Sequence, residues 1–214
     1  ANVDFDMQNR HHISYNLMMI HANTQSVGDY NGKNSIFSDD YENLGFTRRQ
    51  QTNDNMLIVN QLMTNWGLTK SLSLDAGASY NMVKGYEPDR RINNLTKAED
   101  GYTLLRGNSQ QRYFSTLDED DLNVKAGLVY RLKDNIEEIS NVRFGYTGRF
   151  VDDNFKATEY NLTVGHVSAI PSLDDFSLDD YYNQENFASD WFKIQKNLDE
   201  YIVKKNIHSA YAEA

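Results

Sequence analysis

The chain has 214 residues, enough for one sizeable domain or two small ones, and its formal net charge of −10 argues against nonspecific binding to nucleic acid. It contains no Cys, which excludes disulfides and thiolate metal sites. The longest aliphatic runs, Leu17–Ile20 and Met56–Val59, are far shorter than the ~20 residues of a membrane-spanning helix, so a helical membrane protein is excluded.

The N-terminal part predicts short strands. Val3, Phe5 and Met7 alternate with two Asp, and a second apolar stripe comprises Ile13, Tyr15, Leu17 and Met19. Alternation of this kind is typical of strands with one apolar face. His11 and His12 are expected in a short turn between the two stripes, and residues 54–66 predict a further strand of blurred polarity.

The central part carries the strongest strand patterns. In "LSLDAGASYNM" (72–82), "LNVKAGLVYRL" (122–132) and "VRFGYTGRF" (142–150), apolar residues alternate with small, polar or charged ones. The first two stretches have about eleven residues each, close to the ~9–11 that cross a bilayer at a tilt. The last residues, "NIHSAYAEA", predict one more strand, which makes about seven.

The predicted connections alternate in length. Short turns are expected at 9–12, 67–71 and 133–140, and long polar loops at 23–52, 87–118 and 157–205. This alternation is typical of an up-and-down membrane barrel, which has short turns on one side and long loops on the other. Within the last loop, Phe187, Trp191, Ile194, Leu198 and Ile202 recur at spacings of three and four, which predicts one amphipathic helix.

Two architectures explain strands with one apolar and one polar face. The first interpretation is a transmembrane barrel with lipid outside and water inside, and the second is a soluble sandwich with a dry core. Trp66, Tyr80, Tyr130 and Tyr146 fit the aromatic girdles of a barrel, but Tyr also has high strand propensity in any sheet.

Four stretches carry a resemblance to a known family. They are "FTRRQQTNDNMLIVNQL" (46–62), "NMVKGYEPDRRINNL" (81–95), "NSQQRYFSTLDEDDLNVKAGLVYRLKD" (108–134) and "SNVRFGYTGRFVDDNFKATEYNL" (140–162). Together they resemble the barrel domain of TonB-dependent outer-membrane receptors of the Bacteroidetes type, and "KKNIHSAYAEA" resembles the start of a further barrel strand. The resemblance follows the chain in order over most of its length.

The resemblance implies an all-β, antiparallel up-and-down transmembrane β-barrel segment that spans residues 1–214, with long extracellular loops and one loop helix. It implies residence in the outer membrane and import of a scarce ligand, such as a siderophore, vitamin, glycan or peptide. The implied partners are outer-membrane lipid, the extracellular ligand, and a plug domain and TonB complex. No segment here resembles a plug, so the chain is expected to be an interior part of an incomplete barrel.

Several polar and aromatic residues are candidates for ligand contact. Arg48, Arg49, Arg90 and Arg91 lie in predicted loop bases and suit an anionic ligand, although a salt-bridge cluster with Glu87 and Asp89 is the simpler interpretation of the second pair. Tyr181, Tyr182 and Trp191 suit stacking on a flat ligand or packing within their own loop. The residues expected to line the lumen are Asp75, Asn81, Lys125, Arg131, Arg143 and Arg149.

Catalytic and metal chemistry is not indicated. The five His have no acidic partners at ligand spacing, and the acidic runs at 39–40, 118–121 and 172–185 lack the spacing of a calcium loop, so they are interpreted as solvated loops. No nucleophile elbow, phosphate loop or dinucleotide fingerprint is present, so no enzyme activity, cofactor or metal is expected. The alternative functions are a soluble all-β ligand- or carbohydrate-binding module and an adhesin-like barrel.

Overall fold

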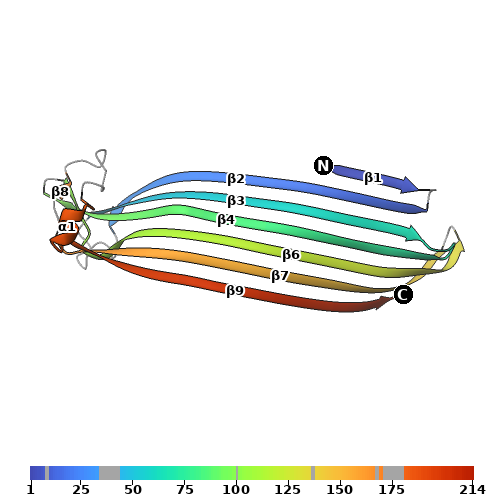
Figure 1. Ribbon diagram of the computed structural model, residues 1–214. Coiled ribbons are helices and arrows are strands. Elements are labelled where there is room, and N and C mark those ends of the chain that lie inside the picture. Colours follow the sequence, from blue (N-terminus) through green and yellow to red (C-terminus); the bar gives the residue numbers. More distant parts are fainter. Residues whose placement is uncertain (8–9, 34–43, 100, 136–137, 167–168, 171–180) are drawn as a thin grey trace.

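The protein folds into one antiparallel β-sheet with almost no helix (Figure 1). The computed structural model describes residues 1–7, 10–33, 44–99, 101–135, 138–166, 169–170 and 181–214. Seven of the nine strands follow one another in the order β1-β2-β3-β4-β6-β7-β9. Their bounds are Asn2–Met7, His11–Lys33, Leu44–Gly67, Leu72–Ala98, Gly107–Asn135, Glu138–Val164 and Phe192–Glu213.

The main strands are much longer than the sequence pattern predicts. β2 has 23 residues and β6 has 29, so strand pairing continues well beyond the alternating stretches into regions that were expected to be loops. The prediction of long loops over 23–52, 87–118 and 157–205 is therefore wrong for most of their length. The alternating pattern ends earlier because apolar residues become sparse there, while the backbone ladder does not depend on side-chain polarity.

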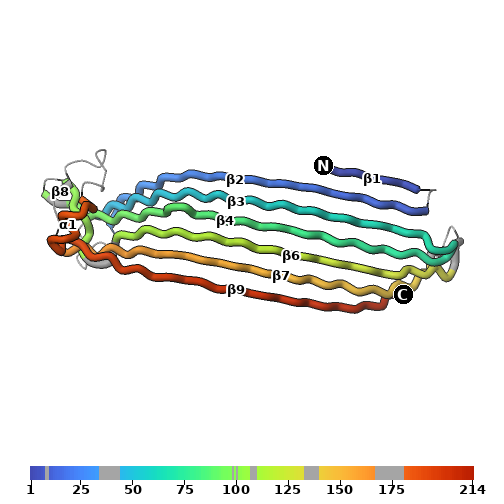
Figure 2. The backbone as a smooth tube through the Cα atoms, in the orientation of Figure 1, coloured from blue at the N-terminus to red at the C-terminus, as the bar shows by residue number. Residues whose placement is uncertain are grey.

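The two ends of the sheet differ, as the alternation of short and long connections predicts. One end has the connections between β1 and β2, between β3 and β4, and between β6 and β7, and none of these exceeds a few residues. The other end carries the longer connections, together with β5 (Gly101–Leu104), β8 (Ala169–Ile170) and α1 (Gln184–Ala188) (Figure 2). We call these the turn end and the outer end.

Strand register aligns the apolar side chains into one continuous band. On neighbouring strands Leu74 pairs with Leu128, and Leu128 with Phe144. Ala78 pairs with Leu62, and Leu62 with Tyr15. Successive side chains on a strand point to opposite faces, so all of these residues share one face. We call it the band face; the apolar band consists of the alternate residues from Ile13 to Met19, Leu62, Leu72 to Met82, Leu122 to Tyr130 and Val142 to Phe150.

The apolar band is exposed. Met19 is 62% exposed and Phe144 58%, and Leu62, Leu128 and Tyr130 are also exposed. Within the described ranges no second layer of the protein covers these side chains. The dry interior that a soluble sandwich requires is therefore absent from this part of the described chain.

A bulge in β4 changes which of its residues point to each face of the sheet. Glu87 pairs with Ser115 and Arg90 with Tyr113, so the two residues Pro88 and Asp89 lie opposite one residue of β6. Pro has no N–H to donate to the ladder, which suits a bulge position. The additional residue reverses the alternation, and Leu95 consequently lies on the band face opposite Phe46. The sequence predicted that the strand would end here; it continues to Ala98.

The described chain has a small hydrophobic core at the outer end. Phe46 is 2% exposed and Leu95 is fully buried; the core also contains Leu104, Leu162, Val164, Tyr181 and Phe192. β5 pairs with the end of β4 and with β8, so the chain folds back over the sheet at this end. The core lies on the same face as the apolar band, and at this end other elements cover it.

The predicted helix over 187–202 is wrong. α1 ends at Ala188, and the residues from Phe192 onward form β9, which pairs with β7 along its whole length. Ile194, Leu198 and Ile202 are spaced by four, which places them on one side of a strand as well as of a helix. Asp190 has a φ of 57° and turns the chain between helix and strand. No helix in the described ranges is long and apolar enough to cross a membrane.

Both edges of the sheet are open. β1 pairs with β2 only as far as Asn16, which leaves the rest of β2 without a neighbour among the described strands on that side. β9 forms the opposite edge over its 22 residues. Each edge presents unpaired backbone N–H and C=O groups that another strand can pair with.

Candidate functional site

The six residues expected to line a lumen lie on one face. Asp75 pairs with Gly127 and Asn81 with Asp121, and Lys125 pairs with Thr147. By alternation these residues, together with Arg131, Arg143 and Arg149, point away from the apolar band. We call this side the polar face. The structure therefore brings these six side chains to a common surface; whether that surface faces a water-filled lumen stays a prediction.

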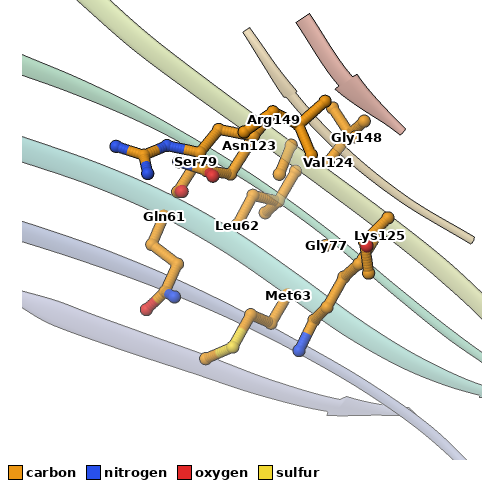
Figure 3. Close-up of a pocket in the computed structure, with 13 residues that line it drawn as sticks. Gln61, Leu62, Met63, Gly77, Ser79, Asn123, Val124, Lys125, Gly148 and Arg149 are labelled. Carbon is orange, nitrogen blue, oxygen red and sulfur yellow. The ribbon is translucent and has the colours of Figure 1, made fainter. Parts of the chain in front are cut away.

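A shallow trough of about 310 Å³ runs across the polar face (Figure 3). Figure 3 shows Gln61 and Met63 of β3, Ser79 of β4, and Lys125 and Arg149 around it. Gly77 forms part of its floor, where a Cβ would lie 3.0 Å from the Lys125 side chain and 3.2 Å from the Leu62 carbonyl oxygen. The trough offers amides, two hydroxyls and two cations to a polar partner or to water.

Arg149 is held by a carboxylate on the next strand. Its Nε lies 3.2 Å from both Asp121 oxygens, and a terminal nitrogen donates to Oδ2 at 3.0 Å. Asn123 donates to the same carboxylate at 3.0 Å. Bidentate bonds of this kind fix the guanidinium plane, so Arg149 presents a defined cation at the trough.

A small apolar patch interrupts the polar face beside the trough. Met18 pairs with Val59 and Ile20 with Leu57, which in turn pairs with Val83. Met18 and Ile20 are exposed. Leu57 and Val59 account for the blurred polarity of residues 54–66. Together the five side chains give the polar face a surface against which another apolar segment can pack.

The four candidate arginines do not form one site. Arg49 and Arg90 lie on the polar face, whereas Arg48 and Arg91 lie on the band face beyond the apolar band. Arg90 lies over the Tyr113 ring at 4.1 Å and 3.7 Å from Glu87. The alternation of strand side chains separates neighbouring residues, which a loop would not do.

The band-face arginines are bound in ion pairs. Arg48 donates to both oxygens of Asp29 at 2.8 Å, and these hydrogen bonds lower the pKa of Asp29. Asp89, in the β4 bulge, accepts from Arg91 at 2.7 Å and from Arg112 at 2.7 Å. Burial alone would raise the pKa of Asp89, but the bonds from Arg112 and Arg91 outweigh it and lower that pKa. The predicted ion pairs of Arg90 with Glu87 and of Arg91 with Asp89 are present, but they lie on opposite faces and do not form one cluster; Arg112 is an unforeseen partner of Asp89.

The three aromatic candidates have different surroundings. Tyr181 is buried in the outer core and donates to the His166 carbonyl oxygen, and burial raises the pKa of its hydroxyl. Trp191 packs on the His166 ring at 4.4 Å. Both therefore pack within their own loop region. Tyr182 alone of the three lines a pocket, on the band face at the outer end.

Comparison with known protein families, curated proteins and solved structures gives no match for this chain. The site therefore rests on its own geometry.

Metal binding finds no support in the described residues, where no group of three or more His, Asp or Glu is placed to hold an ion. The acidic run 118–121 forms part of β6 and is not a loop, and the runs at 39–40 and 172–180 lie outside the described residues. His11 and His12 begin β2 instead of forming a turn, and His11 stacks on Trp66 with ring centroids 4.3 Å apart.

Sequence reasoning did not find Gln110 and Arg112. Gln110 is almost fully buried; its amide accepts from the Asn94 N–H at 2.9 Å and donates to the Asn94 carbonyl at 2.6 Å. Its side chain thereby makes the hydrogen bonds that the backbone of a neighbouring strand would make to Asn94. Nothing in the local sequence indicates these roles, because they depend on the bulges in β4 and β6.

Proposed function

We propose that this chain is part of a transmembrane β-barrel of the outer membrane, in a receptor of the TonB-dependent type that imports a scarce ligand. The single observation that carries the proposal is the exposed apolar band. Strand after strand, the register places alternate apolar residues on one uncovered face. In water such a surface is unfavourable, whereas against hydrocarbon it is the normal outer surface of a barrel.

The height of the band supports this proposal. Alternation over 72–82 and over 122–132 spans about 36 Å along each strand at ~3.3 Å per residue. A strand tilted by ~45° covers about 25 Å of that along the membrane normal, which is the height of the apolar band on known barrels. Beyond this height the band face carries ion pairs such as Lys156–Glu200 and Lys204–Asp152, which suit water.

The open edges support a larger barrel. In hydrocarbon, unpaired backbone groups are very costly, so both β2 and β9 require further strands beside them. In the proposed orientation the turn end faces the periplasm and the outer end faces the exterior. The polar face then lines a lumen, and the patch around Met18 and Leu57 suits contact with a plug domain on which a TonB complex acts.

The membrane proposal is tested by site-directed spin labelling, which the absence of native Cys makes straightforward. Ala126→Cys places a nitroxide on the exposed band face, and Thr147→Cys places one on the exposed polar face at the same height. In lipid vesicles we expect the label at 126 to collide mainly with oxygen and the label at 147 mainly with a water-soluble nickel complex.

Two results would overturn the membrane proposal. Equal access of the nickel complex to both labels would indicate a chain in water, and protection of position 126 from both reagents would indicate a second protein layer, as in a soluble binding module.

The receptor type is tested separately by sequencing the flanking coding region. A plug segment upstream is expected, and a coding region without one would contradict that part of the proposal.

A further inference from the structure

The second pocket lies on the face opposite the trough. It occupies about 720 Å³ between the outer parts of β4, β6, β7 and β9 and the segment that contains Tyr182 and α1. Its strand residues, including Arg91, Arg112 and Phe192, belong to the band face, beyond the apolar band. This volume falls in the range of ordinary small-ligand sites.

The floor of the pocket is cationic. Arg91 and Arg112 are its charged lining residues, and each keeps about two fifths of its side chain exposed (40% and 43%). Asp89 fixes both guanidinium groups from below but does not line the pocket. No carboxylate lines it within the described ranges. In a chain with a net charge of −10, two fixed cations at one pocket favour an anionic group.

The walls of the pocket combine rings with amides. Phe114 meets Tyr160 edge-on with centroids 5.9 Å apart, and Tyr182 meets Phe192 in the same manner at 5.2 Å. Phe187 of α1 completes the aromatic wall and is half exposed. The amide lining residues are Gln50, Asn93, Gln110, Gln111, Asn183 and Gln184.

We propose that this pocket binds an anionic saccharide, meaning a sugar that carries a carboxylate or a phosphate. The aromatic rings offer flat apolar surfaces to the C–H face of a sugar ring, and the amides match its hydroxyls. Arg91 and Arg112 bind the anion. The hydroxyl of Tyr182 is buried and has no hydrogen-bond partner in the described chain. The site is separate from the proposed lumen and does not depend on transport.

The test is calorimetric titration of the full chain in detergent with a galacturonic acid tetramer, with its methyl ester as the neutral control. Both probes have the same rings, and only the first is charged. We expect saturable binding of the acid and about tenfold or weaker binding of the ester, because hydrogen bonds to charged groups contribute most. Equal binding of both probes would overturn the proposal, and so would failure of the chain to bind either the acid or a phosphorylated sugar.

Variants localise the binding. Arg112→Gln and Phe187→Ala are each expected to weaken binding of the acid about tenfold or more. Phe187 is exposed, so its replacement is expected to leave the fold intact. It therefore tests the pocket even if Arg112→Gln disturbs folding. Lys156→Gln removes a cation from the same face outside the pocket and is expected to bind normally. If Lys156→Gln weakens binding as much as Arg112→Gln, the pocket is not the site.

A second arm separates the two sources of such a sugar. Phosphorylated core oligosaccharide from lipopolysaccharide is titrated alone and in competition with the tetramer. Binding of the core sugars, abolished by Arg112→Gln, assigns the pocket to a surface glycolipid. Binding of the tetramer alone assigns it to a free acidic oligosaccharide. If neither saccharide binds, the proposal fails.

Discussion

The outer core and the apolar band show how one face of one sheet meets two different surroundings. Phe46 and Leu95 at the outer end lie beneath folded-back segments, whereas Phe144 and Leu128 in the band lie open. The sequence that follows the strands builds a second layer at the outer end and leaves the band bare. This difference shows that the chain supplies its own cover for the apolar side chains at the outer end and, within the described residues, none for the band.

The largest effect is expected in the outer core. Phe46→Ala removes a ring that is 2% exposed and leaves a cavity, which costs about 3–5 kcal/mol of local stability. Hydrogen exchange in detergent is expected to lose protection at the outer ends of β3 and β4. The matched variant Phe144→Ala truncates an exposed band residue and leaves that protection unchanged. Equal loss in both variants would mean that the two regions are energetically alike.

A charge in the band sharpens the comparison from the other side. Leu128→Arg is expected to cost about 2–4 kcal/mol in vesicles, because Arg on a lipid-facing position near the bilayer centre is poorly solvated. Thr147→Arg, on the polar face at a similar height, is expected to have little effect. Urea unfolding in vesicles measures both. A band that tolerates Arg as well as the polar face does is not covered by lipid.

Gln110 tests whether the outer core also depends on polar contacts. Gln110→Ala removes two side-chain hydrogen bonds to the backbone of Asn94, and the expected cost is about 1–3 kcal/mol. Local hydrogen exchange at β4 reports it. Gln111→Ala, on the other face of β6, is the control and is expected to be close to neutral. The same loss in both variants would assign the effect to strand propensity.

The smallest effect is a response to acid at the outer end. The pKa values of Asp29 and Asp89 are lowered in the fold, so their ion pairs stabilise it above the unfolded pKa of about 3.9 and lose that contribution as pH falls through the folded pKa. Below about pH 4, pepsin is expected to cut the outer end sooner than the band. Asp89→Asn is expected to reduce this pH dependence. Cleavage of both regions at the same pH would refute the assignment.

The sequence predicted the strands of the band because each combines an apolar face with a polar one. It identified the seven main strands and the face that each of the six lumen candidates occupies. Strand lengths were underestimated, since polar residues such as Thr52 and Asp118 extend the ladder opposite other polar residues. The spacing of four at Ile194, Leu198 and Ile202 was interpreted as a helix, but these residues belong to a strand.

The outer pocket was beyond prediction from the sequence. Tyr182 was a candidate together with Tyr181 and Trp191, but its pocket neighbours lie on two distant segments, Arg112 and Phe114 on β6 and Phe192 on β9. Arg91 joins them because β4 shifts its alternation at Pro88, which no local pattern reveals. Arg90 and Arg91 were expected to act together, but they lie on opposite faces because adjacent residues of a strand alternate.

The bulge at Pro88 and Asp89 makes the outer third of β4 sensitive to insertion and deletion rather than to substitution. Removing either residue would restore strict alternation and exchange the orientations of everything from Arg91 to Thr96. Leu95 would then leave the core and Arg90 would leave Tyr113, while every amino acid beyond the deletion stayed the same. A length change of one residue there would therefore be more damaging than most replacements of the residues it displaces.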